Sequence, residues 1–165
     1  MKKLGFTLAE VLIAMGLVGV IAAMTVPTFV VNCRQQANDS KFAATAADLE
    51  NAFGNMVVSE LVNDFTETAF YSSMTKANLE KYVKLNRGGT KAELYGSIAF
   101  KQGDGCKTTL VLNPTTVLEL KNGAYFLVMS KTEGYIDVNG KDKPNCLSRD
   151  KYKVEINKHG FLKKK

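Results

Sequence analysis

The hydrophobic pattern begins with a long apolar run near the N-terminus. No side chain from Val11 to Cys33 carries a charge. As a helix rising 1.5 Å per residue, this stretch would extend roughly 35 Å, which exceeds a bilayer core of about 30 Å. Apolar side chains surround the run and leave no polar face. The pattern therefore predicts a membrane-spanning helix.

Beyond this run the pattern becomes amphipathic. From Arg34 to about Val62, apolar side chains recur at three- and four-residue spacing. We expect one continuous helix with a membrane half (6–31) and an amphipathic half (32–62), kinked but not ended at Pro27. The amphipathic stripe that a sheet would cover consists of Phe42, Ala46, Leu49, Phe53, Met56, Val57 and Leu61.

The remaining residues, 63–165, change to strand patterning and predict a globular head. A polar loop is expected over residues 63–75 and a short helix over 77–85, stopped by Arg87-Gly88-Gly89. Asn122-Gly123 is a strong hairpin signal. Successive hairpins predict an antiparallel sheet packed on the helix, an α+β fold. The candidate strands are Leu94–Phe100, Thr108–Leu112, Val117–Leu120, Ala124–Met129, Tyr135–Val138 and Tyr152–Ile156.

One acid, Glu10, stands at the start of the apolar helix. A carboxylate within a membrane is costly unless another group requires it. Cleavage after Gly5 would give Phe6 a new α-amine, mostly protonated at neutral pH, four residues before Glu10. On neighbouring copies staggered along one axis, this cation and Glu10 would compensate each other and fix the stagger.

The sequence Gly-Phe-Thr-Leu-Ala-Glu, followed by a long apolar helix, resembles the class III leader and N-terminal helix of type IV pilins and type II secretion pseudopilins. This resemblance implies cleavage between Gly5 and Phe6 by a membrane-embedded prepilin peptidase, with residues 1–5 as the leader. It also implies N-methylation of Phe6 and a role for Glu10 as the assembly acid.

The predicted function is a structural subunit of a type IV pilus or type II secretion pseudopilus. Its implied partners are prepilin peptidase, other pilin or pseudopilin subunits and the assembly machinery. Lys2 and Lys3 precede the span and should stay in the cytoplasm. We thus expect a single pass through the bacterial cytoplasmic membrane with the head outside, followed by entry into a periplasmic or cell-surface filament.

Three other readings stay open. A conventional cleaved signal and a plain membrane anchor that never polymerises are both disfavoured by Glu10. The third is a minor or tip subunit that acts as a binding module, either an adhesin or a DNA-uptake component. The sequence supplies no aromatic groove or basic stripe for such binding.

Net charge changes this picture little. The formal charge is +6, and cleavage would remove Lys2 and Lys3. Lys163, Lys164 and Lys165 end the chain, and we expect them to form a solvated tail. Contact between this tail and DNA is the less favoured alternative.

The three cysteines of an exported chain allow one disulfide and one free thiol. Cys33 ends the membrane run, whereas Cys106 and Cys146 both lie in the distal half, so we favour pairing of Cys106 with Cys146. Three unpaired buried thiols are the alternative. No cysteine and histidine spacing here suggests zinc.

A second polar cluster spans residues 136–150. It resembles in sequence a segment near the C-terminus of pseudopilin-like proteins, and it is similar in position to the calcium loop of major pseudopilins. That resemblance makes Asp137, Asn139 and Asp150 candidate calcium ligands. The spacing does not fit an EF-hand. The alternative is a structural loop whose Asp side chains cap backbone N–H groups while Arg149 pairs with an acid.

The sequence contains almost nothing that is typical of a catalytic site. His159 is the lone histidine and sits beside Gly160 in an expected terminal turn. No G-x-S-x-G or H-E-x-x-H sequence is present. The segment 103–108 faintly resembles a phosphate loop, but a predicted strand follows where a helix should begin. We expect a non-enzymatic protein with no cofactor other than the candidate calcium ion.

Overall fold

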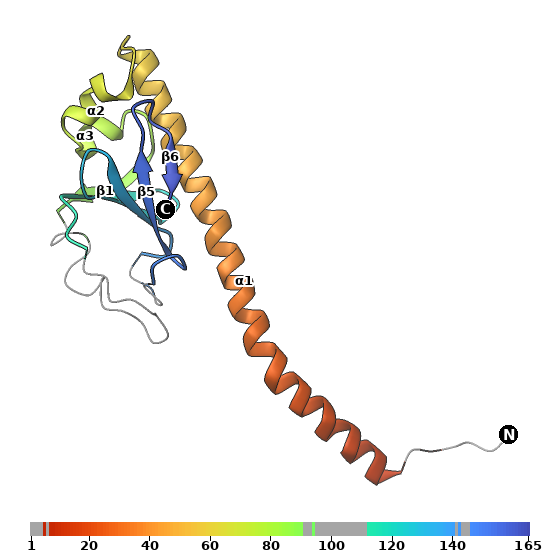
Figure 1. Ribbon diagram of the computed structural model, residues 1–165. Helices are drawn as coiled ribbons and strands as arrows, with labels where there is room; N and C mark the ends of the chain where they lie inside the picture. Colours follow the sequence, from red (N-terminus) through yellow and green to blue (C-terminus); the bar gives the residue numbers. More distant parts are fainter. Residues whose placement is uncertain (1–4, 6, 91–93, 95–111, 141, 143–145) are drawn as a thin grey trace. The chain divides into compact units, whose positions relative to one another are not determined.

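A computed structural model describes residues 5, 7–90, 94, 112–140, 142 and 146–165. The chain forms two compact units, Met1–Ala37 and Asn38–Lys165. One helix, α1 (Leu8–Ser59), begins in the first unit and ends in the second (Figure 1). Pro27 lies inside α1 without ending it. The long N-terminal helix predicted from the sequence is thus confirmed, with slightly narrower limits.

Two short helical segments, η1 (Phe65–Glu67) and α2 (Ala69–Ser72), lie where the sequence predicted a loop. A third, α3 (Lys76–Leu79), overlaps the predicted short helix. The loop prediction was wrong because Thr68 starts α2: its Oγ1 accepts the Tyr71 N–H at 3.2 Å. The predicted helix over 77–85 was also too long, because a strand begins at Leu85.

Six strands form one sheet whose spatial order follows the sequence, β1-β2-β3-β4-β5-β6. Every neighbouring pair is antiparallel. A long helix packed on an antiparallel sheet confirms the α+β class and is a pilin-like architecture. The strands are β1 (Leu85–Gly89), β2 (Thr116–Leu120), β3 (Tyr125–Val128), β4 (Glu133–Asp137), β5 (Lys151–Ile156) and β6 (Leu162–Lys164).

The sequence predicted the four central strands, β2 to β5, and the turn between β2 and β3. In that turn, Gly123 has a φ of +76°, and its N–H donates to the Leu120 carbonyl at 3.0 Å. The two edge strands were not predicted. In particular, the chain end expected to be a tail forms β6 beside β5, although Lys163, Lys164 and Lys165 are exposed as predicted. The candidate strands over 94–100 and 108–112 lie outside the described residues, except for Leu94 and Leu112.

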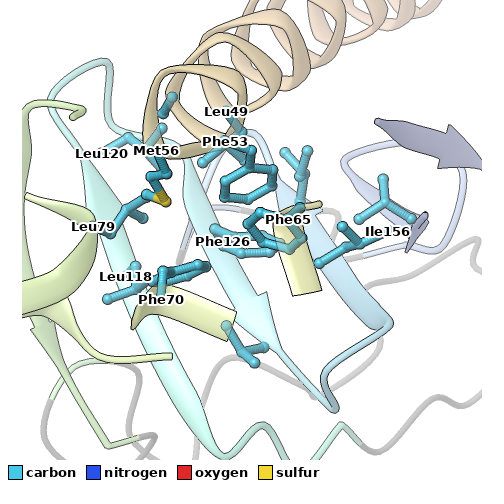
Figure 2. Close-up of a cluster of buried hydrophobic side chains, with 14 of the residues drawn as sticks. Leu49, Phe53, Met56, Phe65, Phe70, Leu79, Leu118, Leu120, Phe126 and Ile156 are labelled. Atoms are coloured by element: carbon cyan, nitrogen blue, oxygen red, sulfur yellow. The ribbon is translucent and has the colours of Figure 1, made fainter. Parts of the chain in front are cut away.

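The main core lies between α1 and one face of the sheet (Figure 2). Leu49, Phe53 and Met56 project from one face of α1 and are fully buried. The Phe53 ring lies 4.5 Å from the Phe65 ring and 6.4 Å from the Phe126 ring, centroid to centroid. The predicted amphipathic stripe therefore packs on the core from Phe42 to Val57. Its last predicted member, Leu61, was wrong: it lies beyond the end of α1 and is 92% exposed.

A second hydrophobic cluster covers the opposite face of the sheet. Val117 and Leu127 are fully buried there, and Leu94 and Leu112 pack in the same cluster. Strand β3 is consequently buried at every position rather than at alternate ones. This explains its continuous apolar sequence, which is typical of a strand covered on both faces.

Candidate functional site

The expected cleavage position lies just before α1. Gly5 is exposed and outside the helix, and a Cβ placed on it would meet no heavy atom within 4 Å. Its partner across the expected scissile bond, Phe6, lies outside the described residues. On its Gly5 side, then, the backbone here is open to solvent.

Glu10 makes a local contact that the sequence analysis missed. The Thr7 N–H and the Thr7 hydroxyl each donate to Glu10 Oε2 at 2.8 Å. In return, the Glu10 N–H donates to Thr7 Oγ1 at 3.3 Å. Thr7 directly precedes α1 and Glu10 is its third residue, so the pair forms a capping box. The T-x-x-E spacing was a signal that could have identified it.

The first part of α1 exposes its apolar side chains. Leu12, Ile13 and Met15 are 60–72% exposed. Among the described residues, α1 is the one helix long and apolar enough to cross a membrane. Side chains added at Gly16 or Gly19 would meet nothing within 4 Å, so both glycines face open space. The segment therefore has a large uncovered apolar surface. The helix is narrower at Gly16 and Gly19, because these residues have no side chain.

The comparisons with known proteins bear on this same segment. A family model described as Prokaryotic N-terminal methylation motif matches residues 1–26. The chain carries a prepilin-type N-terminal methylation motif. No curated protein and no solved structure matches the chain. The methylation motif accompanies a helix-on-sheet fold of pilin-like architecture.

Downstream of the methylation motif, the second candidate site is the turn region between β4 and β5. The side chain of Asp137 is fully buried, and its Oδ2 lies 2.6 Å from Lys151 Nζ. Its Oδ1 accepts the N–H groups of Asn139 at 3.3 Å and Gly140 at 2.9 Å. Burial raises the pKa of Asp137 to about 6, against the opposing effect of the Lys151 ammonium.

The other two candidate ligands are also engaged with the protein. Asp150 is buried, and its Oδ1 accepts the Cys146 N–H. Asn139 Nδ2 donates to the Asp142 carbonyl at 3.0 Å. Within the part of the chain that the structure describes, no group of three or more His, Cys, Asp or Glu side chains could hold a metal ion. In the described part of this loop, the Asp137 and Asp150 side chains accept backbone N–H groups of the loop itself.

Two cysteines are described. Cys33 is a free, exposed thiol and Cys146 is disulfide-bonded. Cys106 lies outside the described residues, so its pairing with Cys146 stays a prediction.

His159 is half-exposed. Its Nδ1 lies 3.0 Å from Asp64 Oδ1, a surface contact between the terminal hairpin and the segment after α1.

Proposed function

We propose that the chain is a structural subunit of a filament of the type IV pilin and type II secretion pseudopilin class. One observation carries the proposal: the methylation motif over residues 1–26 includes the start of α1, whose apolar side chains there are uncovered. A globular head then follows, with a core of its own.

The uncovered apolar part of α1 would be covered first by lipid in the membrane and then by protein in the filament. Exposed apolar surface costs roughly 25 cal/mol for each Å² in contact with water, so this segment must lie in lipid or against protein. In the cytoplasmic membrane, lipid would cover it, with Lys2 and Lys3 on the inner side. In a filament, helices of neighbouring copies would replace the lipid. Gly16 and Gly19, which face open space, would permit close helix approach.

Cleavage of the leader would create the α-amine that pairs with Glu10 in the proposed contact between neighbouring copies. Prepilin peptidase would cleave between Gly5 and Phe6, and Phe6 would be N-methylated. The new amine would then meet Glu10 of a neighbouring copy. Before that meeting, the Thr7 capping box supplies hydrogen bonds to the Glu10 carboxylate, which lowers the cost of holding an acid near the membrane.

Processing is tested by co-expressing the chain with a prepilin peptidase and measuring intact mass. The wild-type protein should lose residues 1–5 and gain one methyl group. Gly5→Asp should retain the full precursor mass, because a side chain at the cleavage position obstructs the peptidase. Gly16→Ala is the matched control and should be cleaved normally, since Gly16 lies inside α1. Mature protein that still begins with Met1 would refute the proposal.

A further inference from the structure

The turn region between β4 and β5 is held around two buried carboxylates, those of Asp137 and Asp150. A buried charge is stable only when it is paired or hydrogen-bonded. Similar loops in pseudopilins suggested a calcium ion for this purpose. The positions of the described side chains point to a different cation, one that belongs to the chain.

Lys151 is placed against Asp137 by the sheet itself. The two residues are register partners at the end of the β4–β5 ladder. The exposed fractions of the Lys151 and Asp137 side chains are 2% and 0%, and Nζ lies 2.6 Å from Oδ2. This is a short, charge-assisted contact without competing water. We infer that the Lys151 ammonium is the built-in cation of this turn region and takes the place of a divalent metal ion.

Both carboxylates also accept hydrogen bonds from backbone donors. Asp137 Oδ1 accepts two N–H groups, from Asn139 and Gly140. Asp150 Oδ1 accepts the Cys146 N–H. Calcium requires six to eight oxygen ligands at about 2.3–2.6 Å. To bind at Asp137, it would have to displace these donors and approach a buried ammonium of like charge.

Backbone hydrogen bonds also hold the turn region between β4 and β5 in place. The Cys146 carbonyl accepts the N–H groups of Arg149, Asp150 and Lys151 at 3.2–3.3 Å. The Val138 N–H donates to the Asp150 carbonyl at 2.8 Å. Lys151 is thus held by its own strand and by the turn that precedes it. It follows that the described part of this turn region keeps its fold without a divalent cation, a property independent of filament assembly.

The test compares melting temperatures (Tm) of the full chain in detergent at neutral pH, with calcium chloride and with the chelator EGTA. The wild-type Tm should differ by no more than about 1 °C, because a ligand that bound only the folded state would raise it. Lys151→Met keeps the apolar stem and removes the charge. It should lower the Tm by about 10 °C or more, because it leaves Asp137 buried and unpaired.

Two further variants isolate the pair. Lys153→Met is the matched control: Lys153 lies on the same strand, and its contact with Glu133 at 2.9 Å is partly exposed. It should lower the Tm by no more than about 2 °C. The double variant Asp137→Asn/Lys151→Met removes both charges and should melt above Lys151→Met alone.

Three results would overturn the inference. One is a wild-type Tm that rises by several degrees with calcium. Another is a Lys151→Met loss no larger than that of Lys153→Met. The third is a double variant that is no more stable than Lys151→Met. If Lys151→Met alone does not fold, a folded double variant supports the pairing and an unfolded one contradicts it.

Discussion

Leu61 takes a left-handed backbone conformation at the end of α1, with a φ of +55°. The Val62 N–H donates to the Val57 carbonyl at 3.2 Å and the Leu61 N–H to the Val58 carbonyl at 3.4 Å. These two bonds form a Schellman motif, in which glycine usually occupies the Leu61 position. Leu61 is 92% exposed, so its side chain adds no burial that would offset the backbone strain.

Leu61→Gly should therefore stabilise the head. Relief of the left-handed strain exceeds the extra unfolded-state entropy of glycine, and we expect a gain of about 0.5–1 kcal/mol in the free energy of unfolding. Leu61→Ala keeps the Cβ and should give no such gain. Chemical denaturation of both variants measures the difference, and equal stabilities would contradict this account.

Glu10 and Lys151 show which functional residues the sequence alone could identify and which it could not. Glu10 was identified because an acid in an apolar run is conspicuous. Lys151 was not identified, because a lysine at the start of an alternating strand is ordinarily solvent-exposed. Its burial follows from the β4–β5 register, which places it opposite Asp137. That register is a tertiary fact that local spacing does not contain.

Among the elements, α1 and the four central strands follow directly from periodicity, whereas the edge strands do not. Strand β1 (Leu-Asn-Arg-Gly-Gly) contains no β-branched or aromatic residue, so its extended form comes from pairing with β2. Strand β6 contains two lysines and was mistaken for a tail. Lys164 Nζ lies 4.3 Å from the centre of the Tyr152 ring, a contact that favours its ordered position.

Phe53 is one of the fully buried side chains by which α1 packs on the core. Its ring contacts Phe65, Phe70 and Phe126. Phe53→Ala should lower the free energy of unfolding of the head by about 3–5 kcal/mol, because it removes a fully buried ring and leaves a cavity. The matched control is Val58→Ala, since Val58 is 73% exposed on the same helix. Its effect should stay within about 0.5 kcal/mol in the same denaturation experiment. Similar losses for both variants would show that α1 is not anchored at Phe53.

For the whole molecule, the main question is whether Glu10 serves its own helix or a neighbouring copy. The capping box explains Glu10 within one chain, whereas the proposed assembly contact requires its negative charge. Glutamine can serve in a capping box but carries no charge. The two roles can therefore be separated by one substitution.

We predict that Glu10→Gln leaves membrane insertion and cleavage intact but prevents incorporation into filaments, as Glu10→Val should. Intact mass reports cleavage, and shearing or cross-linking of filaments reports incorporation. Asp48→Asn removes an exposed charge from the distal part of α1 and should incorporate normally. If Glu10→Gln incorporates as well as the wild type, the role of the acid is limited to capping.

The position of Cys33 has a practical consequence. Its thiol is free and exposed on α1, while Cys146 is protected in a disulfide under non-reducing conditions. A maleimide fluorophore or a nitroxide label can therefore be attached at Cys33 without mutagenesis. Such a label would lie at the end of the apolar run, where a change in its emission or spin mobility would report passage from lipid into a polymer.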